Sequence, residues 1–307
     1  MVFMGKRLQK INWQSYNREL IQRGSITFWI CEESLSNWFN ISSGCGFQKI
    51  YSDLAIEMLL LLRCRFRLTL RGTQGFAESI LKMMGLHLPI PNYSTLSRRA
   101  QELEIELKKR TSRSGLLHVV IDSTGLKVFG EGEWKVRQHG YSKRRTWRKL
   151  HVCVDESTGE ILSSILTDNS FKDNEVFEDL ILNADQDIYQ ATADGAYDAK
   201  NCWEFCEKEN IQGTFPPREG AKIQQHGNVN QTPKQRDENL RLVRELGKPA
   251  WKVLSGYSRR SLSETTMYRF KTIFGDKLNA RNFGNQATEA FIKCKILNLM
   301  KTPSVLQ

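Results

Sequence analysis

The chain has few of the residues that build disulfide frameworks or zinc sites. Of its 307 residues, seven are cysteines and five are histidines, and both types are scattered. An odd number of separated cysteines predicts no disulfide framework, so we expect reduced thiols in a cytoplasmic protein. Cys202 and Cys206 lie one helical turn apart, but no second Cys or His pair with ligand spacing follows. Two buried thiols are therefore the preferred interpretation over a zinc site.

Long apolar segments are missing as well. Residues 1–7 lack the apolar region of a signal peptide, and the run at residues 58–62 is far too short to cross a bilayer. The sequence also contains no internal repeat or low-complexity tract. We expect a soluble protein with no membrane partner, long enough for one large domain and one smaller domain.

Positive charge is abundant but unevenly distributed. The chain has 45 Lys and Arg against 34 Asp and Glu, a formal net charge of +11. Residues 151–200, however, contain twelve acidic and two basic residues. A basic excess predicts binding to a polyanion. Acids in the middle of a basic chain suit a metal-dependent nucleic-acid enzyme, because cations hold phosphates and carboxylates hold the metal.

The first third of the chain has helical patterns, and we expect an all-α domain over residues 1–112. Three helices fall between residues 51 and 110, with Ser52 and Ser94 as N-caps and Gly85 closing the second. The third carries Arg98 and Arg99. Three short helices ending in a basic one favour a helix-turn-helix-like module that binds DNA, although many helical bundles share this pattern. Further helices are expected at 16–23 and 33–39.

From residue 115 onward the pattern changes to short strands. The order of three strands, helix, strand, helix and strand predicts a ribonuclease-H-like α/β domain with a mixed sheet. The domain is expected at 113–300, with a loop-plus-helix insertion at about 219–248 and a tail at 301–307. The expected strands cover residues 116–122, 147–154, 161–166, 188–193 and 212–215, and the helices between them cover 174–183 and 199–209.

Two acids stand at the ends of expected strands. Asp122 ends the first strand and Asp194 ends the fourth, and these strands are neighbours in the expected sheet. Their carboxylates can then converge at one edge. Each acid also has a structural alternative, because Asp122 precedes a Ser-Thr-Gly sequence and Asp194 precedes Gly195, both typical of turns. Asp198 competes with Asp194 for any metal role.

A third acid shares a helical stripe with two cations and a phenol. Tyr257, Arg260, Glu264 and Lys271 recur at spacings that return to one helix face. An acid among cations suits a place where metal and phosphate are held together. The alternative is a capping box, in which Ser261 caps the helix and the Glu264 side chain bonds back to it.

Taken together, Asp122, Asp194 and Glu264 offer three hard oxygen donors, which predicts a site for Mg²⁺ or Mn²⁺.

These residues, in this order, resemble those of bacterial insertion-sequence transposases of the DDE type. The Tyr-x₂-Arg-x₃-Glu-x₆-Lys signature of that family is matched by Tyr257, Arg260, Glu264 and Lys271. The stretches 121–127 and 192–198 around the first two acids are also similar, as are 147–151 and 215–218. The resemblance covers roughly residues 50–300.

The resemblance implies that Asp122, Asp194 and Glu264 are the catalytic residues and hold two Mg²⁺ ions, with Mn²⁺ as an alternative. It also implies that Arg260 and Lys271 contact DNA. Other residues are expected to contact DNA from their chemistry, although an ordinary solvated face is the alternative for the basic ones. They are Tyr257, Lys143, Arg144, Arg145, Arg148, Arg98 and Arg99.

The implied activity is DNA transposition. The protein would bind the terminal inverted repeats of its element in double-stranded DNA, cleave there, and transfer the 3′ ends to target DNA. A homodimer or larger synaptic complex and a bacterial, nucleoid-associated location follow from the same resemblance. Two alternatives stay open: a catalytically silent, element-derived DNA-binding protein, and a ribonuclease-H-like nuclease that cuts without strand transfer. The intact acidic triad argues against the silent alternative.

Overall fold

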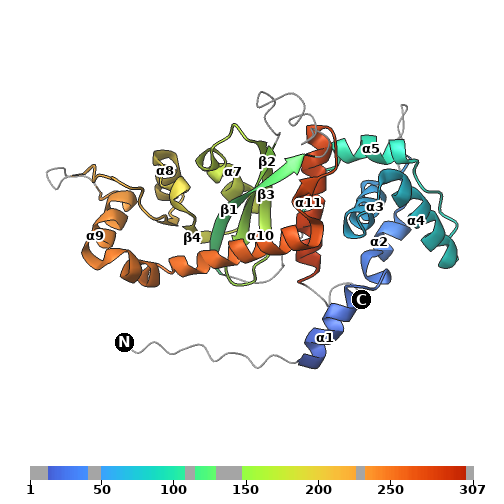
Figure 1. The fold of residues 1–307 in the computed structure, drawn as a ribbon, viewed down its shortest axis with the longest axis horizontal. Coiled ribbons are helices and arrows are strands. Elements are labelled where there is room, and N and C mark those ends of the chain that lie inside the picture. Colours follow the sequence, from blue (N-terminus) through green and yellow to red (C-terminus); the bar gives the residue numbers. More distant parts are fainter. Residues whose placement is uncertain (1–12, 41–49, 108–114, 129–146, 226–231, 302–307) are drawn as a thin grey trace, which may run out of the picture.

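The structure is a computed structural model that describes residues 13–40, 50–107, 115–128, 147–225 and 232–301. A mixed β-sheet lies near the middle of an elongated molecule, and a separate group of helices lies at one end (Figure 1). Helices cover both faces of the sheet. Within the described residues no helix combines the length and apolarity needed to cross a membrane.

The sheet has the predicted ribonuclease-H-like order, β3-β2-β1-β4-β5. Strands β1, β2 and β3 pair antiparallel, whereas β4 and β5 run parallel to β1. A short additional strand, β6, pairs in parallel with the far end of β1 and was not predicted. The strands are β1 (Leu117–Val128), β2 (Trp147–Asp155), β3 (Ile161–Asp168), β4 (Ile188–Thr192), β5 (Gln212–Thr214) and β6 (Lys277–Leu278).

Each face of the sheet has its own apolar core, because successive side chains of a strand point to opposite faces. Val119 and Ile121 of β1 pack with α7 (Phe177–Ala184) and α8 (Lys200–Lys208) on one face. Leu126 of β1 belongs to the core on the other face, with α10 (Ser261–Phe274) and α11 (Phe283–Leu299). Cys202 and Cys206 of α8 are free thiols buried in the first core, where burial raises the pKa of Cys202 to about 12.

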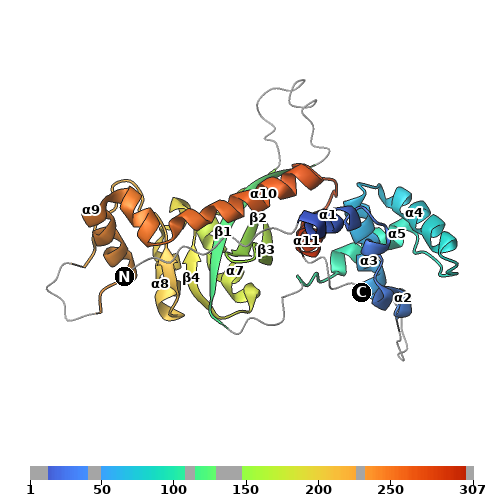
Figure 2. The same ribbon diagram turned by 90° about the horizontal axis from the view of Figure 1, so that it is seen from below.

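Helix α11 joins the sheet to the helices at the end of the molecule. It lies between β3 and this helical group in both views (Figures 1 and 2). Residues of α11, of the sheet and of the helical group form one apolar core. The group consists of α1 (Trp13–Gln22), α2 (Glu32–Ser36), α3 (Asp53–Arg65), α4 (Leu70–Met83) and α5 (Tyr93–Glu102).

Of the three helix-end residues predicted for the helical group, Ser52 and Gly85 are confirmed and Ser94 is wrong. Ser52 caps α3 by accepting a hydrogen bond from the backbone N–H of Ala55, and Gly85 follows α4 with a φ of 71°. Ser94 is not the cap of α5. Asn92 takes that place, because its Oδ1 accepts from the backbone N–H of Ser94 at 2.9 Å.

Strand β1 is longer than predicted, so Asp122 does not stand at its end. The strand continues for six residues, to Val128, and the Ser-Thr-Gly sequence after Asp122 is extended rather than a turn. Gly125 lies where a Cβ would stand 3.3 Å from the Trp147 ring of β2. A glycine therefore lets the indole lie across the strand at this point.

The loop-plus-helix insertion predicted at about 219–248 contains the first part of a helix that is broken at a glycine. Helix α9 (Gln235–Leu254) is interrupted at Gly247, whose φ of 76° and ψ of 155° are not helical. A second helical piece then continues to Leu254, which was not predicted. It leads into a 3₁₀ turn, η4 (Tyr257–Arg260), and from there directly into α10.

We predict that Asn298 fastens α11 to the sheet. Its buried amide accepts from Ile161 N at 2.8 Å and donates to Ile161 O at 2.7 Å. Asn298→Ala leaves both backbone groups of Ile161 without these partners and should lower the free energy of unfolding by about 2 to 4 kcal/mol. Urea denaturation measures the change. The exposed Asn183→Ala is the control and should stay within about 0.5 kcal/mol; equal effects would contradict the role of Asn298.

Candidate active site

The parallel pairing of β1 with β4 places two acids side by side. Val120 of β1 pairs with Thr192 of β4. Asp122 and Asp194 each lie two residues beyond that pair, so continuing the register brings them to the same level. Asp122 accepts from the backbone N–H of Ser123 at 2.9 Å, and Asp194 accepts from that of Ala196 at 2.8 Å.

Asp198, the competitor of Asp194, has a structural role. It is buried, and its carboxylate accepts from Trp203 Nε1 at 2.8 Å, from the Arg218 backbone N–H at 2.9 Å and from Arg236 Nε at 3.1 Å. A carboxylate so fully engaged is not available to a metal ion. Asp194 is the remaining choice on this segment.

The start of α10 packs over β1 and brings a third acid to the site. The buried Ser263 lies within 3.3 Å of Asp122, measured from its Oγ to Oδ2. One residue further on, Glu264 accepts from Arg260 Nη1 at 2.6 Å. The capping-box alternative is wrong: Arg260 occupies the N-cap position without a side-chain cap, and Ser261 is already helical.

The negative charges of the acids and the positive charge of Arg260 affect one another's pKa values. Burial raises the pKa of Asp122, and Asp194 raises it further, while Ser123, Arg260 and Ser263 pull it down; the net shift is upward. Burial lowers the pKa of Arg260, but Tyr257 and the three acids raise it, and the net shift is again upward. All three carboxylates therefore act on the same guanidinium.

The donor chemistry fits a divalent cation, but the three acids are not gathered around one point. Asp122 and Asp194 are neighbouring hard oxygen donors that repel one another, a repulsion that a bound cation would relieve. Glu264 is held by Arg260 instead. Within the described ranges, no three His, Cys, Asp or Glu side chains are grouped closely enough to hold a metal. Glu264 would have to leave Arg260 to become a third ligand.

The predicted α-helical stripe is wrong in its first half, because Tyr257 and Arg260 lie on the 3₁₀ turn η4 and α10 begins only at Ser261. Tyr257 is half-buried on η4, with its ring centroid 5.3 Å from that of Trp251. Burial raises the pKa of the Tyr257 phenol, with smaller contributions from Asp194, Glu264 and Asp122. Lys271 is exposed, two turns along α10 from Glu264.

Two of the arginines predicted to contact DNA, Arg99 and Arg148, bond to other parts of the protein. Arg99 is a correction: it is buried, pairs with Asp53 and donates to the backbone oxygen of Tyr51 at 2.7 Å, so it holds the helical group together. Arg148 donates from Nε to Gln286 of α11 at 2.8 Å, and Arg98 is exposed. Lys143, Arg144 and Arg145 lie outside the described residues.

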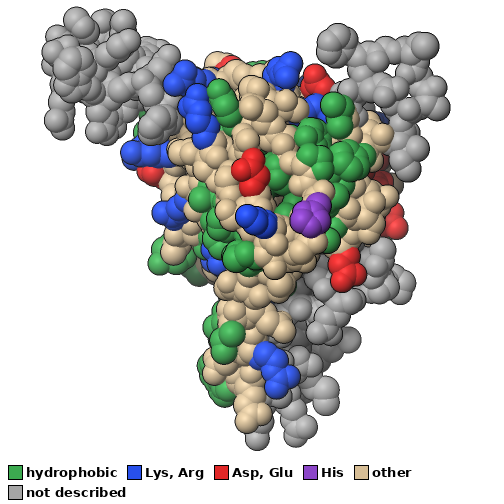
Figure 3. All heavy atoms as spheres, turned by 90° about the vertical axis from the view of Figure 1, so that its right-hand side faces the viewer, with side chains coloured by type: hydrophobic (Ala, Val, Ile, Leu, Met, Phe, Trp, Pro, Cys, Tyr) green, Lys and Arg blue, Asp and Glu red, His purple; other side chains and the backbone are tan. Residues whose placement is uncertain are grey.

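The end of the molecule formed by the helical group shows no uniform basic face. Lys and Arg side chains there are interspersed with apolar and acidic ones (Figure 3). With Arg99 buried, the basic character of α5 is reduced to Arg98. DNA binding by this group therefore stays a prediction.

Sequence reasoning missed two residues next to the acids. Ser263 contacts Asp122 from α10, and only its position beside Glu264 could have drawn attention to it. Tyr197 is buried with its hydroxyl unpartnered among the described residues. Burial and the carboxylates of Asp173, Asp194 and Asp122 raise the pKa of its phenol. A tyrosine three residues after an expected metal ligand was the available signal.

Comparison with known families decides the relationship. A family model described as a transposase DDE domain matches residues 113–299, and a second with the same description matches residues 21–131. The chain belongs to the DDE transposase family. Members of this family generally use divalent metal ions. A solved structure, the Drosophila P element transposase strand transfer complex, has a TM-score of 0.30 and 11% identity over 87% of this chain and 70% of that one. A likeness this weak supports no conclusion.

We predict that the Asp122 charge destabilises the metal-free transposase. Its folded pKa lies above the unfolded value, so the folded state loses stability as the pH rises through the folded pKa. Asp122→Asn removes that charge and should raise the free energy of unfolding by about 1 kcal/mol at about pH 7.5, with no gain at about pH 3.5.

Urea denaturation in a chelating buffer at both pH values tests this. Asp168→Asn is the control, because Ser170 lowers the pKa of the exposed Asp168 and its ionised form is favoured in the fold. That variant should gain nothing at neutral pH. A destabilised Asp122→Asn would show that Asp122 is a structural acid.

Proposed function

We propose that this protein binds the terminal inverted repeats of an insertion sequence, cleaves phosphodiesters there and transfers the 3′ ends to target DNA. The observation that carries the proposal is the β1–β4 register, which puts Asp122 beside Asp194 under the helix that bears Glu264. A membrane or small-molecule function has no comparable support.

Asp122, Asp194 and Glu264 would hold two Mg²⁺ ions, or Mn²⁺, as the family generally uses divalent metals. Metal ions bound by such acids supply positive charge that activates the attacking oxygen and stabilises the departing one in an in-line displacement. The acids themselves would orient the site: Asp122 from strand β1, Asp194 from the N-cap of the 3₁₀ turn that follows β4, and Glu264 from the first turn of α10.

Arg260 has two possible partners in this proposal. In the structure it binds Glu264, which keeps its guanidinium within electrostatic reach of both aspartates. A DNA phosphate is an alternative acceptor for the same guanidinium, and it can accept two hydrogen bonds at once. Arg260 would transfer from Glu264 to the phosphate, which frees Glu264 for metal. Lys271 and Tyr257 would contact the strand on either side.

The division of labour follows the order of elements. Residues 1–112 would bind the DNA ends, residues 113–300 would carry out catalysis, and the insertion at 219–248 and the tail at 301–307 have no assigned part. The partners would be double-stranded DNA and at least one further copy of the chain, because two ends must be handled together. A nucleoid-associated, cytoplasmic location would suit this function.

Asp122→Asn, Asp194→Asn and Glu264→Gln should each abolish cleavage of end-containing DNA in Mg²⁺ or Mn²⁺. The substitutions keep side-chain shape and remove only the negative charge that a cation requires, so a gel-shift assay should show intact binding. Asp168→Asn, an exposed acid at the end of β3, is the matched control and should cut like wild type. Near wild-type cleavage by any of the three variants would show that residue to be wrongly assigned.

The same assay separates the alternatives. Cleavage with joining of the 3′ ends supports transposition, cleavage without joining supports a nuclease, and binding alone supports a silent DNA-binding protein. A sequenced joint between the element end and target DNA is the decisive product.

Lys271→Ala should weaken DNA binding and reduce the dependence of log K on log salt by about one unit, because one phosphate contact is lost. Fluorescence anisotropy over a salt series measures this slope. Lys208→Ala, which removes an exposed lysine from α8, is the control and should leave the slope unchanged. An unaltered slope for Lys271→Ala would remove Lys271 from the DNA interface.

A further inference from the structure

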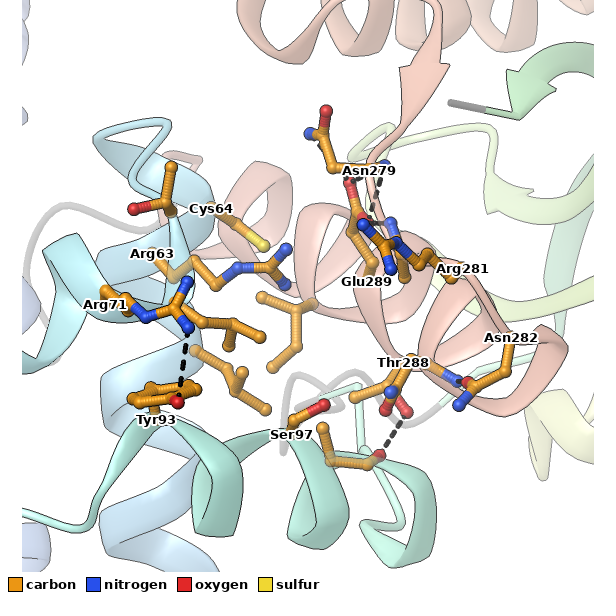
Figure 4. A pocket seen from close by; sticks show the side chains of 17 residues that line it. Arg63, Cys64, Arg71, Tyr93, Ser97, Asn279, Arg281, Asn282, Thr288 and Glu289 are labelled. Atoms are coloured by element: carbon orange, nitrogen blue, oxygen red, sulfur yellow. Dashed lines mark hydrogen bonds between the residues drawn. The ribbon is translucent and has the colours of Figure 1, made fainter. Parts of the chain in front are cut away.

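A cavity of about 540 Å³ lies between the helical group and α11, away from the acids of the active site. Figure 4 shows its walls: α3, α4 and α5 on one side, and the segment leading from β6 into α11 on the other. None of the residues discussed above as catalytic or DNA-contacting lines it. The site therefore needs an account of its own.

Three arginines line this cavity: Arg63 from α3, Arg71 from α4 and Arg281 from the segment before α11. Arg63 and Arg281 extend toward its middle from opposite sides (Figure 4). Arg63 Nε is buried and has no hydrogen-bond partner among the described residues. Arg71 donates to the hydroxyl of Tyr93 at 3.2 Å and lies 4.3 Å from the centre of that ring, which leaves further N–H groups for a ligand.

Helix starts add to this positive potential. The N-cap of α4, Thr69, the first residue of α5, Tyr93, and the N-cap of α11, Asn282, all line the cavity. The N-terminal end of a helix carries partial positive charge and backbone N–H groups that bind anions. Three such ends and three arginines at one cavity reinforce one another.

The one acid in the lining, Glu289, is already neutralised. Its Oε1 accepts from the buried Lys293 at 2.8 Å, and its Oε2 accepts from the backbone N–H groups of Asn279 and Ala280, each at 2.9 Å. Glu289 therefore does not offset the arginines. Burial and the nearby Glu289 raise the pKa of the Cys64 thiol to about 12, so this lining residue is uncharged as well.

We propose that this cavity binds a phosphate group of a nucleic-acid strand. Three guanidinium groups match phosphate oxygens in charge and geometry, and Tyr93 offers a ring against which a sugar or base can pack. The proposal rests on the proposed function for the identity of the strand. Inorganic phosphate or a free nucleotide would use the same contacts, and the experiment separates these sources.

The double variant Arg71→Gln/Arg281→Gln removes the two exposed arginines of the cavity and keeps the partly buried Arg63, so the fold should be retained. Binding of an end-containing duplex is measured by anisotropy over a salt series without divalent metal. The variant should bind several-fold more weakly at low salt, and its salt slope should fall by about 1 to 2 units. Arg71→Lys/Arg281→Lys keeps both charges and should restore most of the slope.

Lys82→Gln/Lys208→Gln is the matched control, because it removes two exposed positive charges that do not line the cavity. Its slope should stay that of wild type. Equal slopes for the two Gln double variants would overturn binding of a strand phosphate in the cavity. Cleavage and joining by the wild-type protein are assayed in parallel. A failure of the cavity proposal can therefore be distinguished from a failure of the proposed transposase function.

A second measurement does not depend on DNA. Thermal unfolding in phosphate is compared with unfolding in chloride at matched ionic strength. Stabilisation by phosphate that is lost in Arg71→Gln/Arg281→Gln and kept in the lysine control supports a phosphate site even if wild type cuts no DNA. If phosphate stabilises the protein in this way but the salt dependence of DNA binding is unchanged in Arg71→Gln/Arg281→Gln, the cavity binds a free phosphate compound. That outcome overturns binding of a strand phosphate. No phosphate effect and no slope change overturn the site altogether.

Discussion

The parallel pairing of β1 with β4 is the constraint on which the candidate active site depends. It sets the carboxylates of Asp122 and Asp194 at the same level of the sheet. Two like charges held this close repel one another, whereas in an unfolded chain they would be separated and hydrated. The resulting repulsion is tolerated because β1 is the central strand, paired with β2 on one side and β4 on the other, with an apolar core on each face. Stability from packing therefore offsets a locally unfavourable arrangement of charges.

Arg260 compensates the charge that this arrangement creates. It interacts with Asp122, Asp194 and Glu264 at once, and its ion pair with Glu264 fixes the third acid beside the first two without merging them into a metal site. In the proposed function, the guanidinium of Arg260 and metal ions from solution would compete for the same carboxylates. Phosphate binding by Arg260 would shift that competition toward metal, so that DNA and metal would favour one another.

The sequence was most informative where a pattern is local and repeated. The succession of strands and helices predicted the ribonuclease-H-like domain. The helical spacing from Tyr257 to Lys271, by contrast, ran past the true helix start, because Tyr257 and Arg260 lie on η4. Partners that are distant in the chain could not be predicted. The sequence presents Arg99 as a surface cation, whereas in the fold it is buried and pairs with Asp53, 46 residues earlier. The pairing that carries β1 past Asp122 comes from β2 and from the two-residue β6, which is too short to have a pattern.

Helix α11 ties the mixed sheet to the helical group, and this bears on how the proposed DNA substrate would be held. Asn298 near its end bonds to β3, Gln286 near its start receives Arg148 of β2, and Asn282 at its cap lines the arginine cavity. The shared apolar core favours a fixed spacing between cavity and acids. In a duplex bound at both places, one backbone phosphate would bind in the arginine-lined cavity while the scissile bond would lie beside the acids at the sheet. The distance along the DNA between the recognised end and the cleaved bond would then be set by the length of helix α11, which is packed in the core, rather than by a flexible linker.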